Sequence, residues 1–353
     1  MLFSKKKKAA DFTSFEGYSA DAPLLELRDF GVTFEAGKGQ PLHAVDSVSL
    51  SVAPRQIVGV VGESGCGKSV MSQSIVRLIE HETAMSYTGA VLYKGVDLLK
   101  LPLSDMRAVR GKEIAVIFQD PQSSLNPVYS VGWQLREAVR VNDPGLSRKQ
   151  ADDVAVELLE KVGIRDARAR LRMYPHEFSG GMQQRVMIAM ALASHPSLLI
   201  ADEPTTALDA TTQAQIVELL RNLAQSEDMA VLFISHDLDV VASLCSRVVV
   251  MYLGQVVEEL PSASLATNAR HPYTRALLRS VAPLRGERRE TLDTIPGQVP
   301  PLSDIPQGCR FAARCEQCGA GCKDGVPALV EVELGHRVRC GACAVSQAEG
   351  EVR

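Results

Sequence analysis

The sequence predicts an α/β fold organised around a parallel β-sheet. Three apolar runs, residues 57–61, 198–201 and 231–235, have the length and composition of buried strands, and each is followed by polar or glycine-rich residues. Helix-compatible segments separate the runs, and this alternation is typical of parallel strands joined by crossover helices. Because ligands bind beyond the carboxyl ends of such strands, the residues after each run are the first candidates for a functional site.

The first run leads into a loop with the pattern G-x-x-x-x-G-K-S, and residues 70–79 after it are compatible with a helix. Glycines let the backbone fold tightly, so several N–H groups point at one anion, and the helix N-terminus adds partial positive charge. Lys68 is expected to reach the terminal phosphates, and the Ser69 hydroxyl to hold Mg²⁺. The sequence therefore predicts a nucleoside triphosphate site made of Gly62, Glu63, Ser64, Gly65, Cys66, Gly67, Lys68, Ser69 and Val70.

The 353 residues divide by composition into three parts. Residues 1–23 are polar and small and are expected to form a flexible tail, whereas residues 24–260 carry the strand-like runs of a nucleotide-binding domain. Within that domain, short apolar segments before residue 53 predict a small antiparallel sheet, and helical spacing from about 131 to 190 predicts a helical subdomain. Prolines interrupt the pattern from residue 261, so residues 261–353 are interpreted as a linker and a small cysteine-rich extension.

Composition and charge restrict the class of protein. Hydrophobic residues make up 46% of the chain, which is enough for a sizeable core, and the net charge of -4 argues against nucleic-acid binding through bulk charge. No apolar run approaches the roughly 20 residues of a membrane span, and no apolar stretch follows the basic start as a secretory signal requires. We therefore expect a soluble, cytoplasmic protein that can sit on a membrane protein.

Polar residues follow three of the predicted buried strands. Gln119 ends the run 114–118, Asp202 and Glu203 end a second strand, and His236 follows a third. Triphosphate hydrolysis needs a metal, a base within reach of water and a contact to the γ-phosphate. Adjacent side chains at a strand end diverge, so we expect one of the two carboxylates to serve the metal and the other the water.

A second glycine-rich helix start lies between these strands. Ser179 is expected to cap an apolar helix, with Gly180 and Gly181 in its first turn. Such a start is a second place where an anion can bind. Phe34, on the N-terminal side of the phosphate loop, is either a core residue or a side chain that stacks on a base.

In this order along the chain, these motifs resemble those of the ATP-binding subunit of ABC transporters. The resemblance covers about residues 24–325 and implies a P-loop ABC ATPase core, in which a parallel sheet is joined by an antiparallel β subdomain and a helical subdomain. It implies ATP and Mg²⁺ as cofactors and transport-coupled ATP hydrolysis as the activity. Glu203 matches the general base, and Phe34 matches an aromatic residue that stacks on the adenine. The resemblance further implies catalytic roles for His236, Gln119 and Lys68, and it places Mg²⁺ ligands at Ser69, Gln119 and Asp202. Gln119, Asp202 and His236 are also expected to contact ATP, and Asp209 matches a D-loop residue. The signature that is expected to face a partner's ATP consists of Ser179, Gly180, Gly181, Met182 and Gln183.

The same resemblance implies partners. In this family two nucleotide-binding domains enclose ATP between the phosphate loop of one and the signature of the other, so a chain with one of each is expected to dimerise. The segments 61–65, 118–121, 124–127 and 176–190 resemble the oligopeptide, dipeptide and nickel importer branch, and segments 271–274 and 308–315 resemble the C-terminal extension of that family. The signature with Met182 resembles that of the D-type subunit, which usually pairs with a distinct F-type ATPase. The implied complex has two transmembrane permease subunits and works with an extracytoplasmic peptide-binding protein.

The implied function is to power import of di- and oligopeptides from the cytoplasmic face of the cell membrane, where the chain is peripheral and binds no nucleic acid. Two alternatives stay open. One is the ATPase of a related nickel, glutathione or other small-solute importer. The other is a soluble ABC ATPase that acts on nucleic acid, although the net charge of -4 argues against it.

Six of the eight cysteines crowd into the last 45 residues. In a cytosolic chain, such crowding suggests metal binding rather than disulfides. The resemblance implies a [4Fe–4S] cluster on Cys309, Cys315, Cys322 and Cys340. The two C-x-x-C pairs that begin at Cys315 and Cys340 instead have a spacing typical of zinc sites. Reduced cysteines without a metal are the third possibility.

Overall fold

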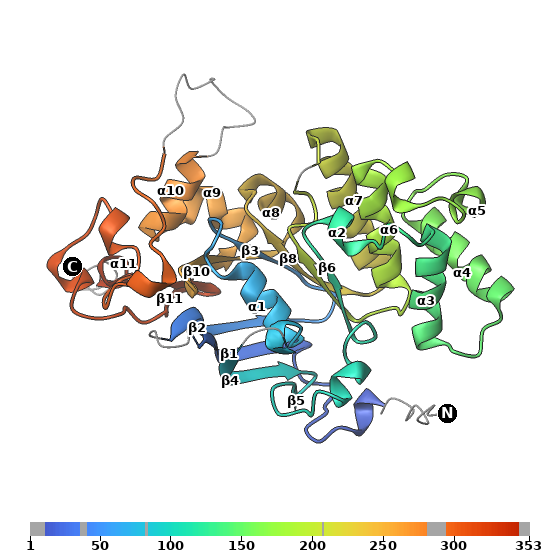
Figure 1. The fold of residues 1–353 in the computed structure, drawn as a ribbon. Helices are drawn as coiled ribbons and strands as arrows, with labels where there is room; N and C mark the ends of the chain where they lie inside the picture. Colours follow the sequence, from blue (N-terminus) through green and yellow to red (C-terminus); the bar gives the residue numbers. More distant parts are fainter. Residues whose placement is uncertain (1–10, 36–40, 82–83, 207, 281–293, 346–353) are drawn as a thin grey trace. The chain divides into compact units, whose positions relative to one another are not determined.

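The computed structural model describes residues 11–35, 41–81, 84–206, 208–280 and 294–345 (Figure 1). The chain forms two compact units. The first unit consists of Met1–Leu25, Val52–Arg55 and Val91–Leu232, and the second of Glu26–Ser51, Gln56–Ala90 and Phe233–Arg353. Four of the described strands have residues in both units, namely β1 (Leu25–Phe34), β2 (Leu42–Val52), β4 (Met85–Tyr93) and β8 (Ala230–Ser235). Among the described residues, no helix has both the length and the apolar composition needed to span a membrane.

The first unit contains the parallel pair β6 (Ile114–Ile117) and β7 (Leu198–Asp202). Every residue of β7 is buried, as expected for a parallel strand that is covered on both faces. The short strand β5 (Val96–Asp97) pairs with the end of β4 in an antiparallel hairpin. Because β6 and β7 run in the same direction, their carboxyl ends lie at the same edge.

The helices of the first unit surround α6. The unit comprises α2 (Pro121–Ser124), α3 (Val131–Asn142), α4 (Arg148–Lys161), α5 (Ala167–Arg170), α6 (Gly180–Leu192) and α7 (Ala210–Ser226). Figure 1 shows α3 to α6 gathered in green, in the segment where the apolar spacing predicts helices. Helix α6 contacts α2, α3, α4, α7 and β6, so it is buried on several sides. This explains why its sequence is apolar almost throughout rather than on one face.

The N-terminal residues differ from the expectation of a flexible tail. A short 3-10 helix, Phe12–Ser14, begins at the cap Asp11, and Phe12 is buried. The ring of Phe12 lies with its centroid 5.2 Å from that of Tyr93, in an edge-on arrangement. This contact orders the segment, because an aromatic pair of this kind adds to the free energy of burying the ring. Residues 1–10 lie outside the described part of the chain.

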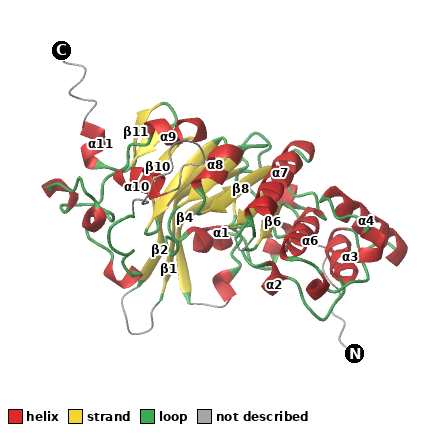
Figure 2. Cartoon of the chain, turned by 90° about the horizontal axis from the view of Figure 1, so that it is seen from above, coloured by secondary structure: helices red, strands yellow, loops and turns green. Residues whose placement is uncertain are grey.

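The second unit carries two sets of strands. In the first set, β1 (Leu25–Phe34) lies between β2 (Leu42–Val52) and β4. In the second, β3 (Ile57–Val61) pairs in parallel with β9 (Arg247–Tyr252), and β9 pairs antiparallel with β10 (Gln255–Pro261). The helices of this unit are α1 (Lys68–Ile75), α8 (Leu238–Leu244), α9 (Leu265–Asn268), α10 (Pro272–Ser280) and α11 (Gly341–Val345) (Figure 2).

The C-terminal extension is part of the second sheet and not a detached appendage. Strand β12 (His336–Val338) pairs antiparallel with β10, and β11 (Val330–Glu333) pairs with β12. Glu258 on β10 is fully buried, and its carboxylate accepts hydrogen bonds from the backbone N–H groups of Arg270 and His271 and lies 2.8 Å from His336 Nε2. A buried carboxylate needs such partners, so the core strand β10 depends on residues far beyond position 261.

Candidate active site

The predicted phosphate loop joins β3 to α1 in the second unit. Gly65 and Gly67 adopt left-handed backbone conformations, with φ of +79° and +97°. A Cβ atom on Gly67 would lie 2.4 Å from the carbonyl oxygen of Ala44, so both conformation and space require glycine there. Gly67 is the N-cap of α1, and the loop therefore has the strand–loop–helix arrangement that the sequence predicts.

Lys68 is held inside this loop. Its Nζ donates hydrogen bonds to the carbonyl oxygens of Gly62, at 2.7 Å, and of Glu63, at 3.1 Å. The side chain is 4% exposed. Cys66 is also buried, and burial raises the pKa of its thiol, so this cysteine is neutral at physiological pH and fills space. The loop thus presents one buried ammonium group beside the N-terminus of α1.

Two residues of the C-terminal extension hold the loop at Glu63. The Tyr273 hydroxyl accepts a hydrogen bond of 2.8 Å from the backbone N–H of Glu63. The Arg314 guanidinium donates two bonds to the Glu63 carboxylate, of 2.7 and 3.0 Å, and a third of 2.8 Å to the carbonyl of Pro296. The Arg314 side chain is 5% exposed. A bidentate guanidinium–carboxylate pair of this kind fixes geometry as well as charge.

Gln119 and Glu203 meet in the first unit, at the ends of neighbouring parallel strands. Gln119 Nε2 donates to Glu203 Oε2 at 3.1 Å, and the Thr206 hydroxyl donates to the same oxygen at 2.9 Å. Glu203 has a φ of +47°, which costs a non-glycine residue about 1–2 kcal/mol. Backbone strain of this kind is concentrated at functional sites, and here it turns the Glu203 carboxylate towards Gln119.

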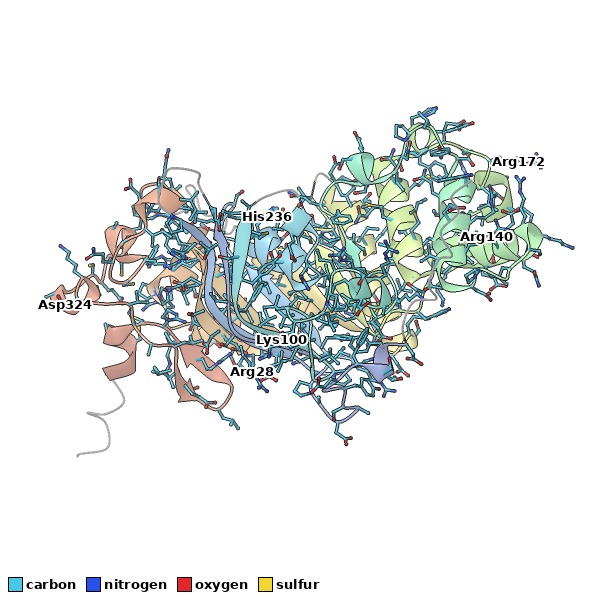
Figure 3. All side chains as sticks on the ribbon, turned by 60° about the horizontal axis from the view of Figure 1, so that its bottom comes forward. Arg28, Lys100, Arg140, Arg172, His236 and Asp324 are labelled. Carbon is cyan, nitrogen blue, oxygen red and sulfur yellow. The ribbon has the colours of Figure 1, made fainter. Side chains whose placement is uncertain are left out.

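The remaining catalytic candidates have different environments. Asp202 is the last residue of β7 and is 1% exposed. His236 directly follows β8 and is exposed (Figure 3). After it, the Asp237 side chain caps α8 by accepting from the backbone N–H groups of Asp239 and Val240, so the position of His236 is fixed by a helix start on one side and a strand end on the other. Phe34 ends β1 and is half-buried, and its role stays a prediction.

The signature begins α6 as predicted. The Ser179 side chain caps the helix by accepting from the Met182 N–H, and Ser179 and Gly180 are exposed. A Cβ on Gly181 would lie 2.4 Å from Cγ2 of Thr212, so α6 and α7 approach closely at this point. Thr212 in turn donates from its N–H and its hydroxyl to the Asp209 carboxylate, at 2.9 and 2.7 Å. The signature and Asp209 are therefore neighbours within one unit.

Gln183 does not face outward with the rest of the signature. Its carboxamide is buried and donates to the carbonyl oxygens of Pro175, at 2.8 Å, and Phe178, at 3.3 Å. These bonds hold the turn that precedes α6. The predicted contact of the signature with a partner's nucleotide stays a prediction for Gln183, as it does for Ser179, Gly180, Gly181 and Met182.

The cysteines of the extension lie in the second unit. Cys309, Cys315, Cys322 and Cys340 all line one small cavity of about 10 Å³, while Cys318 is exposed and does not line it. A hydrogen bond from Cys343 lowers the pKa of Cys340 to about 6. Among the described residues, no three side chains of His, Cys, Asp or Glu converge closely enough to hold a single metal ion. The [4Fe–4S] set and the zinc set that includes Cys318 both stay predictions.

Comparison with known proteins identifies the family. The family model described as "ABC transporter" matches residues 45–206, and the model described as "Oligopeptide/dipeptide transporter, C-terminal region" matches residues 257–322. A probable peptide ABC transporter ATP-binding protein of Sinorhizobium fredii is 49% identical over 317 residues, which cover 90% of this chain and 94% of that protein. The chain belongs to the ATP-binding subunits of ABC transporters.

Other members of this ABC family agree in sequence and fold. A putative peptide import ATP-binding protein of Brucella melitensis is 46% identical over 329 residues, covering 90% of this chain and 96% of that protein. A dimeric post-hydrolysis structure of the ATP-binding cassette MJ0796 bound to ADP and Pi superposes with a TM-score of 0.60 at 26% identity, covering 67% of this chain and 98% of that one. The predicted ABC ATPase fold and enzyme class are confirmed.

Sequence reasoning missed the two residues that hold Glu63. Segments 271–274 and 308–315 indicate only membership of the importer branch, and nothing in them assigns a role to Tyr273 or Arg314. Arg314 lies 251 residues from its partner, and one sequence carries no signal for a contact of that range. A set of aligned relatives in which positions 63 and 314 change together would have found it.

Proposed function

We propose that this chain hydrolyses ATP to power import of di- and oligopeptides across the cytoplasmic membrane. The observation that carries the ATPase assignment is the Glu203 carboxylate, which is held by Gln119 and Thr206 at the carboxyl end of a buried parallel strand. The peptide cargo is supported by the match of residues 257–322 to the oligopeptide/dipeptide transporter C-terminal region and by the names of the bacterial relatives.

In the proposed reaction each side chain has one task. The loop N–H groups and Lys68 bind the β- and γ-phosphates, and Phe34 stacks on the adenine. Glu203 orients the attacking water and accepts its proton, which is the task of a general base within hydrogen-bond reach. His236 contacts the γ-phosphate. Because charge spreads over the phosphate oxygens during transfer, fixed donors such as these lower the barrier.

Mg²⁺ fits the proposed ligands Ser69, Gln119 and Asp202. A hydroxyl, a carboxamide oxygen and a carboxylate are the oxygen ligands that this ion prefers. When bound, Mg²⁺ neutralises charge on the β- and γ-phosphate oxygens. Asp202 is almost fully buried and precedes Glu203 at the strand end, so the two carboxylates can serve the metal and the water separately.

The proposed assembly contains a second ATPase subunit, a distinct F-type chain, together with two transmembrane permease subunits. An extracytoplasmic peptide-binding protein delivers the cargo, and the chain is peripheral on the cytoplasmic face. Exposure of Ser179 and Gly180 at the start of α6 supports the arrangement in which this signature faces the partner's ATP, since exposed N–H groups at a helix start favour anions.

A [4Fe–4S] cluster on Cys309, Cys315, Cys322 and Cys340 is part of the proposal. Four thiols line one small cavity, and four is the number of thiolates that bind such a cluster, each to its own iron. A lowered pKa of Cys340 favours the thiolate that iron requires. Iron, sulfide and zinc analysis with a visible absorption spectrum tests this; a colourless protein with stoichiometric zinc contradicts it.

The test of the catalytic assignment is Glu203→Gln. We expect the variant to bind ATP with unchanged affinity and to hydrolyse it at least about 100-fold more slowly, since a positioned base contributes 10²–10⁴-fold. Glu218→Gln, which neutralises a half-exposed carboxylate on α7, is the control and should hydrolyse normally. Unchanged hydrolysis by Glu203→Gln contradicts the general base. Active hydrolysis without peptide uptake by the reconstituted transporter contradicts only the cargo.

A further inference from the structure

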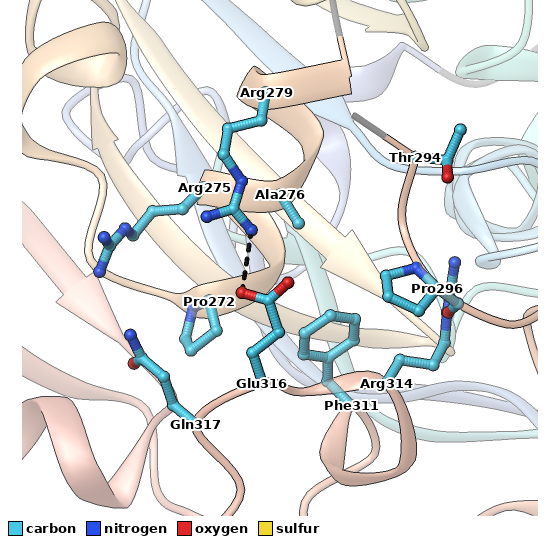
Figure 4. A pocket seen from close by; sticks show the side chains of 10 residues that line it. All are labelled: Pro272, Arg275, Ala276, Arg279, Thr294, Pro296, Phe311, Arg314, Glu316 and Gln317. Carbon is cyan, nitrogen blue, oxygen red and sulfur yellow. Dashed lines mark hydrogen bonds and ion pairs between the residues drawn. The ribbon is translucent and has the colours of Figure 1, made fainter. Parts of the chain in front are cut away.

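A cavity of about 490 Å³ opens between α10 and the segment that follows Phe311, within the second unit (Figure 4). Polar side chains dominate its lining, and Phe311 with Pro272 and Pro296 adds an apolar wall. The side chains that carry the argument are Arg275, Arg279, Arg314, Glu316, Gln317 and Phe311. A cavity of this volume is in the range that binds small organic molecules. None of the proposed catalytic residues lines it.

The lining of this cavity is positively charged. Among the residues that the structure describes, three guanidinium groups and one carboxylate, that of Glu316, line it. Even with Glu63, which pairs with Arg314 from outside the lining, the arginines outnumber the carboxylates. The chain as a whole has a net charge of -4, so an excess of arginine across the protein does not explain this concentration.

The three arginines differ in how firmly they are held. Arg314 is 5% exposed and fixed by Glu63 and the carbonyl of Pro296, so its charge is a permanent part of the wall. Arg279 contacts Glu316 at 3.4 Å, across the cavity in Figure 4. Arg275, one helical turn before Arg279 on α10, makes no ion pair or side-chain hydrogen bond within the part of the chain that the structure describes. The fixed guanidinium group of Arg314 therefore lines the same cavity as those of Arg275 and Arg279.

We propose that this cavity is a binding site for a small organic anion that carries a phosphate or carboxylate group. Guanidinium groups bind both oxyanions in a bidentate manner, and Arg275 and Arg279 are placed to do so on one side of the cavity. Gln317 offers a carboxamide for further hydrogen bonds. The apolar wall at Phe311 and the prolines accommodates the carbon skeleton of the ligand, and the charge of the lining suits one or two negative charges.

The site is coupled to the phosphate loop through Arg314, a step that rests on the proposed function. One face of the Arg314 side chain lines the cavity, while its nitrogens hold the Glu63 carboxylate at 2.7 and 3.0 Å. An anion in the cavity competes with Glu63 for this guanidinium and loosens the loop. Anion binding and ATP binding therefore oppose one another, and by linkage each weakens the other by the same factor.

Binding is tested on the full-length protein by calorimetric titration with sodium pyrophosphate and, separately, sodium citrate. We expect at least one probe to bind, and the double variant Arg275→Gln, Arg279→Gln to bind it at least about tenfold more weakly, because each charge-assisted contact is strong. Binding of pyrophosphate alone assigns a phosphate ligand, and binding of citrate alone a carboxylate ligand. The control Arg28→Gln, Arg55→Gln removes two exposed arginines, 62% and 69% exposed, and should bind normally.

A second variant separates this site from the phosphate loop. Lys68→Ala should retain the probe, because Lys68 does not line the cavity. The proposal is overturned if neither probe binds, if binding is lost in Lys68→Ala but kept in the α10 double variant, or if the exposed control loses it equally. For the coupling, saturating probe should raise the Kd for ATP at least about fivefold in the wild type and not in the α10 double variant. An unchanged Kd for ATP, with the probe bound, overturns the coupling and leaves the proposed ATPase unaffected.

Discussion

At the scale of single residues, the partners of Glu63 allow the clearest prediction of a change in the free energy of unfolding. Its carboxylate is one partner of a bidentate pair, and its backbone N–H is bonded to a buried tyrosine hydroxyl. Burial raises the pKa of Tyr273, so this hydroxyl stays neutral. Loss of one partner from a pair of this kind leaves a charge without compensation, which costs more than the pair itself contributes.

Arg314→Met is therefore expected to destabilise the protein. We expect a loss of about 1–3 kcal/mol in the free energy of unfolding, measured by urea unfolding, and weaker ATP binding. In a double-mutant cycle with Glu63→Gln the two changes should not add. The Arg28–Glu26 pair is also bidentate, but the Arg28 side chain is 62% exposed, so its cycle should give a coupling below about 1 kcal/mol. Equal coupling in both cycles contradicts the role of Arg314.

His271 gives the chain a defined acid sensitivity. The side chain is 1% exposed, and burial lowers its pKa from 6.5 to about 4. Because the pKa of this histidine is higher in the unfolded chain, the unfolded chain takes up the proton first as the pH falls. The folded state therefore keeps its full stability with respect to this group above about pH 6.5 and loses stability between pH 6.5 and 4. From pH 7 to pH 5 the histidine should cost about 2 kcal/mol of the unfolding free energy.

The measurement is urea unfolding at both pH values. His271→Asn should flatten this acid dependence, while His195→Asn, which replaces a histidine whose side chain is 75% exposed, should leave it as in the wild type. An acid dependence that is the same in all three proteins shows that His271 does not titrate as burial predicts.

The candidate site was predictable where its chemistry is local. A few consecutive residues indicate a function at two places, where Lys68 and Ser69 follow the glycines of the loop and where Glu203 follows an apolar strand. The bonds from the Gln183 carboxamide to the carbonyls of Pro175 and Phe178 could not be predicted, because the signature pattern does not indicate which of its side chains turns inward. The hold of Arg314 on Glu63 spans 251 residues and leaves no local pattern.

At the scale of elements, the contact between α6 and α7 sets how the signature is presented. A Cβ atom on Gly181 would lie too close to Thr212, at 2.4 Å, so the absence of a side chain leaves room for Thr212. A Cβ atom on Gly180 would lie 3.7 Å from Leu208, which is an ordinary van der Waals contact. Two adjacent glycines at one helix start thus have different constraints. Neither has a left-handed φ, so the difference comes from space and not from backbone conformation.

Gly181→Ala should therefore destabilise the protein by about 1–3 kcal/mol, as overpacking does. Gly180→Ala is the matched control and should be neutral or slightly stabilising, because alanine is favoured over glycine in a helix. Thermal unfolding of the two variants measures the difference. Equal midpoints would show that α6 shifts at no cost and that its distance from α7 is not fixed by Gly181.

The elements themselves were largely predictable. The parallel strands β6 and β7 read as continuous apolar runs because both faces are covered, and α6 begins at its predicted cap. The 3-10 helix at Phe12 was missed, because a lone aromatic residue in a polar segment carries no periodic signal. Its structure depends on Tyr93, which lies far along the chain.

At the scale of the whole molecule, the extension completes the sheet of the second unit. The buried carboxylate of Glu259 on β10 pairs with Arg247 and with Arg337, and that of Glu258 with His336. Arg339 donates to the carbonyl of Val256 at 2.8 Å. The composition change at residue 261 indicated a linker and a small cysteine-rich extension, but not the pairing of β12 with β10, because strand pairing cannot be seen in composition.

A stop codon after residue 304 should accordingly abolish soluble expression or cooperative unfolding. It would remove His336, which pairs with Glu258, and Arg337, which pairs with Glu259, and a buried carboxylate that loses a partner costs about 3–5 kcal/mol. A stop after residue 345 retains every contact described above and is the control. Soluble, cooperatively unfolding protein from the shorter chain would show that the domain ends near residue 261 after all.

The ion pair between Glu63 and Arg314 forms late during synthesis of the chain. A ribosome adds about 5–20 residues per second, so the 251 residues between the two partners take roughly 10–50 seconds to make. During that interval the phosphate loop exists in the nascent chain without its anchor. A chain released early carries every motif for binding the nucleotide but not the arginine that holds the loop, so premature products of this gene should compete poorly with finished subunits for ATP.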